Sequence, residues 1–413
     1  MNSHHNHHDS APRTEHSARQ THKLALASLI VSIGAVVLLS LPAGIVAIAL
    51  AVKAKKRGHT TPMPTVAIAL GVLSLVVSIF VTVFAVSYYV NEFLPMLYPD
   101  LFEEEVTTEA TLTEEQTYNF VPQSDGTYAL SVAEGVELSG IITVPDRHDG
   151  RAVTAIAEKG FSGQSKLSRV LLPDGIRVIG DGAFENCDHL YSLSLGKDLT
   201  SIGAGAFAGC AQLEELELPD GVTVMGEGAF KGCASLKTLT VPAGVTRIEA
   251  DTFRGCAGLT KVKIPRGVTF VGSYAFSGCE KLTALTLPDS VTVLESYALE
   301  NCAKLSELHI PTGVTVLSEG VLYGCASLKG ITLHEGIRVI SPRAFGACFL
   351  LREITVPLSA ETVAASAFEG CSNLAAFGYA GTLEEWSKVK VSGEWPDTLL
   401  RIACTDGEIR LSA

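Results

Sequence analysis

The sequence predicts a solenoid of short parallel strands, built from about ten 23-residue repeats and preceded by a two-helix transmembrane hairpin. Leucine, phenylalanine and cysteine recur in register between residues 161 and 374. Two long apolar runs without a charged residue, 24–52 and 65–90, precede these repeats. The formal net charge of −13 argues against nucleic acid as a partner, because polyanions bind to basic surfaces.

Residues 1–23 are predicted to be a disordered tail, because they are polar, rich in histidine and without apolar periodicity. The run "HHNHHD" from His4 to Asp9 offers imidazole groups, which zinc, nickel and copper accept as ligands. A flexible tail does not fix the geometry of such ligands. We therefore favour a solvated tail, and predict no metal site and no cofactor.

The two apolar runs predict membrane-spanning helices, since each exceeds the ~20 residues that cross a bilayer. Gly34, Pro42 and Gly44 interrupt the first run, whose excess length is accommodated by tilt or a kink. If that run instead folds back as two short helices, the tail lies inside the cell and the second helix keeps its direction. The side of the membrane on which the tail lies stays open.

The basic residues between the runs predict the orientation of the hairpin. Lysine and arginine cluster at 53–57, whereas 58–146 contain neither. The positive-inside rule therefore places this loop in the cytoplasm and everything after about residue 91 outside. The acidic segment 91–120 is predicted to be a stalk. The letters "LPAGIVAIALAVKAKKRG" and "VAIALGVLSLVVSI" resemble a two-helix domain of unknown function found in Gram-positive bacterial membrane proteins.

Three columns of residues define the repeat at a period of 23. The leucine column is Leu167, Leu190, Leu213, Leu236, Leu259, Leu282, Leu305, Leu328, Leu351 and Leu374. The aromatic column is Phe161, Phe184, Phe207, Phe230, Phe253, Phe276, Leu299, Leu322, Phe345 and Phe368. The cysteine column is Cys187, Cys210, Cys233, Cys256, Cys279, Cys302, Cys325, Cys348 and Cys371, with Gln164 in the preceding place.

Each unit has the form "LxxLxLPxGVTxIGxGAFxGC", and its letters have mechanical roles. The letters "LxxLxL" predict a short strand with alternate side chains pointing inward. Proline then ends the strand, glycine turns the chain, and "VTxI" runs back as a second strand. The Ala-Phe pair places a ring in the core. Stacking completes that core, because one unit alone cannot bury its faces.

These letters resemble the BspA-like bacterial leucine-rich repeats, and the resemblance covers roughly residues 127–404. It implies a leucine-rich repeat solenoid with an N-terminal cap and first repeat at 121–163, repeats at 164–374 and a C-terminal cap at 375–413. The last segment replaces the leucine pattern with Trp386 and Trp395. Members of that family are often displayed on bacterial cell surfaces, where several bind partners.

The cysteine column is predicted to be packing rather than chemistry. Zinc sites use cysteine pairs roughly two to four residues apart, and single cysteines 23 apart match no such pattern. Stacked strands give parallel Cβ vectors, whereas a disulfide needs vectors that converge. We therefore expect reduced thiols that act as small buried apolar groups, and leave Cys404 open. The sequence shows no "GxSxG", Walker or "HExxH" motif, so we predict that the protein is not an enzyme.

The outward positions of "LxxLxL" are the third and the fifth, and they form the first candidate face, which we expect to be concave. Their charges come in bands separated by neutral rows. The candidate partner-binding residues there are Arg169, Glu215, Glu217, Lys261, Lys263, Glu307, His309 and Glu353. The alternative is a solvated sheet face without a partner, for which Lys, Glu and Thr are well suited.

The variable position of "VTxI" forms the second candidate face, expected on the convex side. Its candidate partner-binding residues are Val224, Phe270, Val293 and Val316. If exposed, they form an apolar stripe of the kind that marks contact surfaces. The alternative is a half-buried second strand.

Together these observations predict a membrane-anchored surface binding protein, located in the bacterial cell membrane as a multi-pass protein with its repeat domain extracytoplasmic. The solenoid is expected to recognise a protein or a glycan, whose identity the sequence leaves open. The alternative is a structural or sensory scaffold of the cell envelope without catalytic activity.

Overall fold

The computed structural model describes residues 114–411. The predicted histidine-rich tail, the transmembrane hairpin and the stalk up to residue 113 lie outside the described residues. Among residues 114–411, no helix is both long and apolar enough to span a membrane.

The fold begins earlier than the predicted end of the stalk at residue 120. Residues Glu114–Thr117 form the short helix α5, and Tyr118–Pro122 form strand β1. Tyr118 is buried, and its ring centroid lies 6.3 Å from that of Phe161 in the core. Residues 114–120 are therefore part of the cap rather than of a stalk, because an aromatic side chain ties them to the first repeat.

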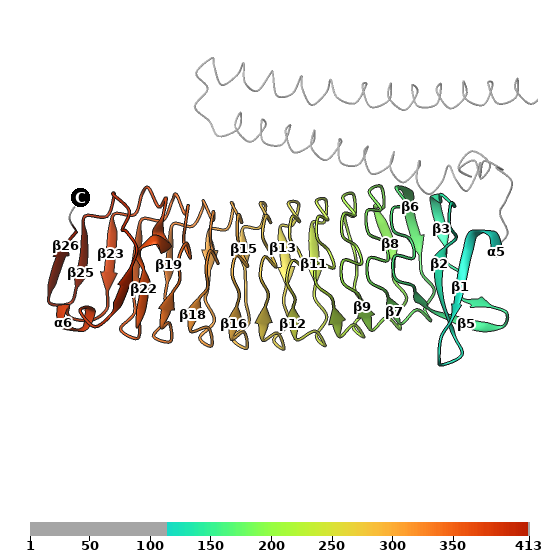
Figure 1. The fold of residues 1–413 in the computed structure, drawn as a ribbon, viewed down its shortest axis with the longest axis horizontal. Helices are drawn as coiled ribbons and strands as arrows, with labels where there is room; N and C mark the ends of the chain where they lie inside the picture. The colour runs from blue at the N-terminus through green and yellow to red at the C-terminus, as the bar shows by residue number, and fades with distance from the viewer. Residues whose placement is uncertain (1–113, 412–413) are drawn as a thin grey trace, which may run out of the picture. The chain divides into compact units, whose positions relative to one another are not determined.

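Most turns of the chain contribute two short strands, which form two columns along the domain (Figure 1). In the first column, the turn at Glu215 contributes an isolated bridge to Ser192 and Thr238 instead of a strand. The first column, from the "LxxLxL" segments, contains β3 (Ser139–Thr143), β6 (Lys166–Leu171), β8 (Ser192–Ser194), β11 (Thr238–Thr240), β13 (Lys261–Lys263), β15 (Ala284–Leu285), β17 (Glu307–Leu308), β19 (Gly330–Thr332), β21 (Glu353–Val356), β23 (Ala376–Tyr379) and β25 (Arg401–Cys404). The second column contains β2 (Tyr128–Val132), β5 (Arg151–Ile156), β7 (Val178–Ile179), β9 (Ser201–Ile202), β10 (Val224–Met225), β12 (Arg247–Ile248), β14 (Phe270–Val271), β16 (Val293–Leu294), β18 (Val316–Leu317), β20 (Val339–Ile340), β22 (Thr362–Ala364) and β24 (Lys390–Ser392).

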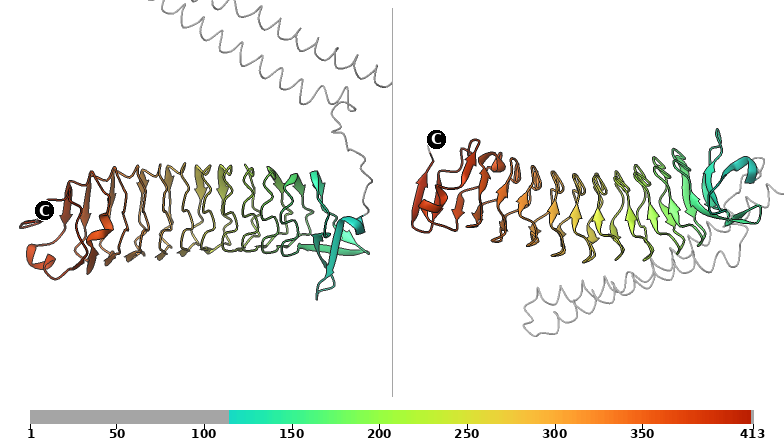
Figure 2. Two further views of the ribbon diagram at one scale, coloured as in Figure 1. Left: turned by 45° about the horizontal axis from the view of Figure 1, so that its top comes forward. Right: turned by 60° about the horizontal axis from the view of Figure 1, so that its bottom comes forward.

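Where neighbouring strands within a column pair, they do so in parallel and in the register that the repeat predicts. Thr238 lies beside Lys261 and Thr240 beside Lys263, which are partners one repeat apart. The described antiparallel pairs occur at the ends, where β1 pairs with β2, β4 (Arg147–His148) with β5, and β25 with β26 (Gly407–Arg410). Figure 2 shows the resulting stack of turns from two further sides. The predicted solenoid of short parallel strands is thus confirmed.

The core is a ladder of stacked side chains. From Phe161 to Phe276, successive rings lie 5.1–5.7 Å apart and within 20° of parallel. Leu299 and Leu322 continue the column, and both are fully buried. Such offset stacks stabilise by about 0.5–1.5 kcal/mol per pair beyond the burial of apolar area. The aromatic and leucine columns therefore form the predicted core.

The two ends of the ladder are closed by residues that depart from the repeat. Gln164 replaces the column cysteine, and its amide accepts a hydrogen bond from the Leu138 N–H at 2.7 Å and donates one to the Val136 carbonyl at 2.9 Å. At the other end the Trp395 ring stacks on Phe368, at 6.2 Å between centroids. At the two ends, where no further repeat is stacked, these side chains supply the hydrogen bonds and the ring contact that a neighbouring repeat would otherwise provide.

Two short helical turns lie near the C-terminal end, η2 (Ala365–Phe368) in the last repeat and α6 (Leu383–Trp386) in the C-terminal cap. Helix α6 begins with a capping box, in which Thr382 and Glu385 satisfy each other's backbone N–H groups. This box holds Trp386 in its buried position against Tyr379.

Candidate partner-binding face

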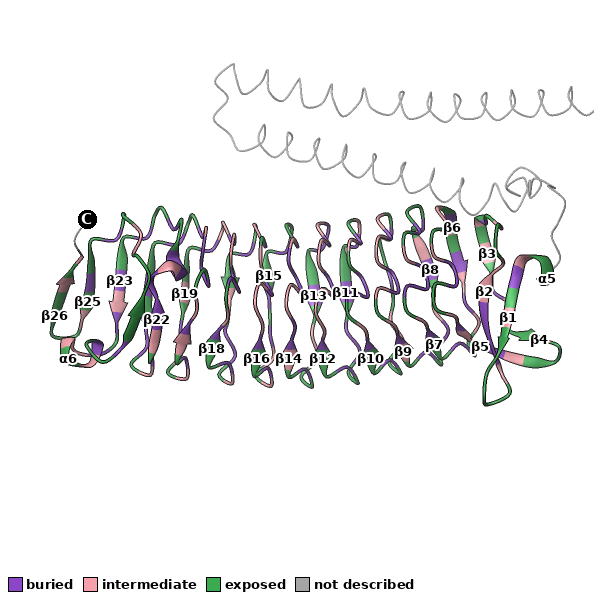
Figure 3. Cartoon of the chain, in the orientation of Figure 1, coloured by how far each residue is buried: buried purple, intermediate pink, exposed green. Residues whose placement is uncertain are grey.

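The outward side chains of the first strand column form a continuous face, here called the LxxLxL face. In β13, Lys261 and Lys263 are exposed and Val262 between them is buried, as the alternation of a strand requires. The same alternation recurs from strand to strand (Figure 3). The predicted candidates on this face are all exposed: Arg169, Glu215, Glu217, Lys261, Lys263, Glu307, His309 and Glu353.

Three shallow hollows lie along this face, and each contains charged residues of one predominant sign. The first, of about 530 Å³, is lined by Glu215 and Glu217. The second, of about 870 Å³, is lined by Lys261, Lys263 and Arg266.

The third hollow, of about 750 Å³, contains Glu307, Glu335 and Glu353. Its floor includes Ala284 and Gly330, where other repeats carry longer side chains. Space is therefore created where small residues lie between rows of long ones. The three hollows alternate in charge: acidic, basic, acidic.

The charged residues that the sequence predicted for this face have no side-chain partners among residues 114–411. Among residues 114–411, none of the charged side chains that the sequence predicted for this face makes an ion pair or a side-chain hydrogen bond, and the same holds for Arg266 and Glu335. These charges are therefore available to a partner or to solvent.

Other charges of the domain are paired between residues one repeat apart, including that of Lys197, which also lines the first hollow. Lys197 bonds to Asp174 at 2.6 Å, and Arg338 bonds to Glu361 at 2.8 Å. The period of the solenoid thus permits such pairs. The LxxLxL face lacks them because its opposite charges lie two strands apart, with neutral rows such as Thr238 and Thr240 between them.

Sequence reasoning missed Arg266 and Glu335 as part of this face. Both follow the end of their strands, outside the two outward positions of "LxxLxL". The structure shows that they line the second and third hollows. Their place immediately after Pro265 and His334, where the strand turns, is the signal that would have found them.

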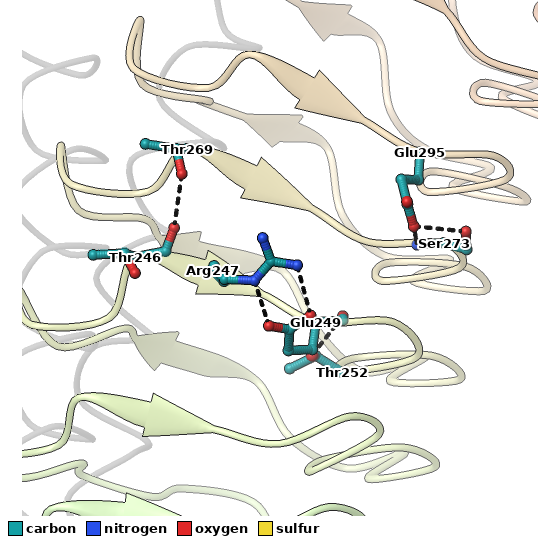
Figure 4. A network of polar contacts seen from close by, with 7 residues as sticks. All are labelled: Thr246, Arg247, Glu249, Thr252, Thr269, Ser273 and Glu295. Atoms are coloured by element: carbon teal, nitrogen blue, oxygen red, sulfur yellow. Dashed lines mark hydrogen bonds and ion pairs between the residues drawn. The ribbon is translucent and has the colours of Figure 1, made fainter.

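The second candidate face, here called the VTxI face, is mixed rather than continuous. Val224, Val293 and Val316 are 53%, 42% and 41% exposed. Phe270 is half-buried, because the Arg247 guanidinium lies 3.7 Å from its ring centroid. Arg247 is held there by two hydrogen bonds to Glu249 (Figure 4). The three valines thus agree with the predicted exposed apolar stripe, whereas Phe270 agrees with the alternative, a half-buried second strand.

Polar contacts extend across this second face from turn to turn. The Thr269 hydroxyl donates to the Thr246 carbonyl at 3.4 Å, and Ser273 donates to Glu295 at 2.9 Å (Figure 4). These polar groups near Phe270 and Val293 are bonded within the domain, in contrast to the predicted charged residues of the LxxLxL face.

The cysteine column is buried, as predicted, and its cysteines are free thiols. The structure adds a role that spacing did not show. Each column thiol donates to the carbonyl of the aromatic-column residue of the preceding repeat, as Cys256 does to Phe230 at 3.1 Å. Sulfur-to-oxygen distances along the column are 3.0–3.3 Å. The thiols are therefore weak hydrogen-bond donors as well as small apolar groups.

Burial also suppresses the reactivity of these thiols. Desolvation raises the pKa of Cys256 and of Cys302 to about 12. The thiolate is the nucleophile and the metal ligand, so a raised pKa disfavours both roles. Cys404, on β25, is half-buried, and desolvation also raises its pKa. The structure thus places Cys404 outside the column and closer to solvent.

The sequence matches the family described as the BspA type leucine rich repeat region, in six copies over residues 147–260 and 246–375. These ranges together span more than half of the chain. No curated protein matches it.

Three solved structures illustrate the similarity. One is a leucine rich cell surface protein from Faecalibacterium prausnitzii, with 24% identity, 67% of this chain and 97% of that chain covered, and a TM-score of 0.38. A leucine rich repeat protein of T. pallidum has 29% identity, covers 41% of this chain and 90% of its own, and has a TM-score of 0.35. A leucine-rich repeat protein of Bacteroides ovatus has 23% identity, 70% and 88% coverage, and a TM-score of 0.36.

Proposed function

Because the chain belongs to the BspA type leucine-rich repeat family, we propose that it is a bacterial surface protein that binds a protein or glycan partner without catalysis. The observation that carries the proposal is the set of unpaired, banded charges on the LxxLxL face. The buried thiols with raised pKa values support a non-catalytic role, because they are poor nucleophiles.

The charge bands do not stabilise the isolated domain. Glu215 and Glu217 are two residues apart and both exposed, a separation of ~6.7 Å in extended backbone. Two like charges at that distance repel by about 0.6 kcal/mol in water. Lys261 and Lys263 repeat this arrangement with the opposite sign. A partner with complementary charges would add attractions that outweigh these repulsions. A solvated face without a partner gives no reason for like charges to be grouped in this way.

The proposal includes anchorage in the bacterial cell membrane with the repeat domain extracytoplasmic. It rests on the apolar runs 24–52 and 65–90 and on the basic loop 53–57 between them. Protease added to cells freed of any outer wall is expected to release the repeat domain. If the repeats resist digestion until the membrane is lysed, the orientation is wrong.

The binding function is tested by affinity capture with the purified full chain on a solid support. We expect a captured molecule that saturates the chain and is displaced by free chain in solution. Lack of any saturable ligand would favour the second candidate, a structural or sensory scaffold. The bonds of Gln164 and the stack of Trp395 on Phe368, which close the two ends of the ladder, fit that role equally well.

A further inference from the structure

The alternation of the three hollows has a definite length. Three of their charged rows, those of Glu215, Lys261 and Glu307, lie two repeats apart along the first column. At the usual spacing of ~4.8 Å between neighbouring strands, successive charge bands are ~9.6 Å apart and all three span ~19 Å. A partner that contacts all three bands must repeat its own charges at this interval.

This interval selects among the regular backbone conformations. On a β-strand, residues on one face recur every ~6.6 Å, or every ~13 Å if alternate ones are used. Neither distance matches the ~9.6 Å between successive bands or the ~19 Å between the first and the third. On an α-helix, the same face recurs after seven residues, or ~10.5 Å. A polyproline II helix returns to the same face every third residue, or ~9.3 Å. Across three bands the polyproline II mismatch is ~0.6 Å and the α-helix mismatch ~1.8 Å.

The rows between the bands are suited to a backbone that crosses the strands. Thr238 and Thr240 separate the first two bands, and Ala284 and Thr286 separate the second from the third. These neutral side chains are exposed and shorter than the charged ones beside them. A segment lying along the domain can therefore place its own charged side chains into the hollows.

We infer that the LxxLxL face binds a polyproline II segment of a protein partner, with charged side chains at every third position in the order basic, acidic, basic. The inference rests on the proposed binding function and specifies its partner. Basic residues of the segment lie against Glu215 and Glu217 and against Glu307, and its acidic residue lies against Lys261 and its neighbours. A polyproline II segment is already extended before it binds, so little conformational entropy is lost.

The test uses the purified full chain and two labelled synthetic peptides of identical composition. The first, PKPPEPPKP, carries the alternating order, and the second, PKPPKPPEP, carries the same charges in a different order. By fluorescence anisotropy at low salt, we expect the alternating peptide to bind at least about tenfold more tightly, since it makes three ion pairs where the other makes fewer and adds repulsions. The difference should disappear in high salt.

A double variant tests whether the preference for one peptide over another follows the charge of the middle band. In Lys261→Glu combined with Lys263→Glu, the middle band becomes mostly acidic, so this protein should prefer PKPPKPPKP to the alternating peptide. Equal binding of both peptides by the unaltered chain, or an unchanged preference in the variant, overturns the inference. Tighter binding of an α-helical peptide with the same charges seven residues apart overturns the polyproline II assignment.

Failure of this inference is distinguishable from failure of the proposed function. If affinity capture yields a saturable partner while the peptides show no preference, the face binds something of different chemistry. If capture yields none, the binding function itself fails, whatever the peptides show.

Discussion

The aromatic ladder makes a quantitative prediction about stability, for which Phe230 is the most informative position. Its ring is fully buried, and it stacks on Phe207 at 5.4 Å and on Phe253 at 5.7 Å. Replacing it with alanine removes both stacks and leaves a cavity in the middle of the ladder. Replacing it with leucine removes the stacks but keeps most of the volume.

The two substitutions should differ clearly in free energy of unfolding. Alanine in place of a buried phenylalanine costs about 3–5 kcal/mol, and the two lost stacks place Phe230→Ala at about 4–5 kcal/mol. The column itself holds leucine at Leu299 and Leu322, both fully buried. Phe230→Leu should therefore cost only about 1–2 kcal/mol, mainly the lost ring contacts.

The assay is urea unfolding of the full chain followed by two probes. The chain has 2 tryptophans, Trp386 and Trp395, which both lie in the C-terminal cap, so their fluorescence reports that end. Far-UV circular dichroism reports all the repeats. Because repeats interact mainly with their neighbours, Phe230→Ala should shift the dichroism midpoint more than the fluorescence midpoint. A loss below about 1 kcal/mol for the alanine variant, or equal losses for both variants, would refute the role assigned to the ladder.

Two further predictions concern the thiols and the N-terminal cap. Alkylation of the native protein at pH 8 should modify Cys404 first among the described cysteines. The reason is that a pKa raised to about 12 leaves the column thiol Cys187 with a thiolate fraction about 1,000-fold below that of an ordinary thiol. Native disulfides between column cysteines, detected by mass spectrometry, would contradict this. Gln164→Ala should destabilise the cap by about 1–3 kcal/mol, since the Leu138 N–H and the Val136 carbonyl lose their bonds to its amide. Hydrogen exchange at the Leu138 amide measures that effect, and unchanged protection would rule it out.

Much of the fold could be predicted from the sequence, because residues at equivalent positions of the repeat have the same role in every unit. The columns at Leu236, Phe230 and Cys233 are each fully buried, as their periodicity indicates. The exposure of Lys261 and Lys263 follows from the two-residue period of a strand. Local periodicity thus predicts which side chains point inward and which outward.

Contacts between neighbouring turns could not be predicted in this way. The bond from Cys256 to the Phe230 carbonyl joins residues 26 apart, and depends on the path of the chain between them. The burial of Phe270 depends on the direction of a single side chain, Arg247, on the preceding turn. The inclusion of residues 114–120 in the cap was missed because these residues lack the repeat's letters.

The central claim is that binding uses the charges of the LxxLxL face, and the most direct test is the salt dependence of partner binding by two double variants. Lys261→Glu with Lys263→Glu reverses one band, whereas Phe270→Ser with Val293→Ser alters the VTxI face. The equilibrium dissociation constant of the captured partner is measured for both and for the unaltered chain at several salt concentrations.

Charge reversal should weaken binding by about tenfold or more and flatten its salt dependence, because attraction to the partner becomes repulsion. The VTxI variant should bind like the unaltered chain. If instead the VTxI variant loses binding while still melting cooperatively, and charge reversal changes nothing, the partner contacts the VTxI face and the central claim is wrong.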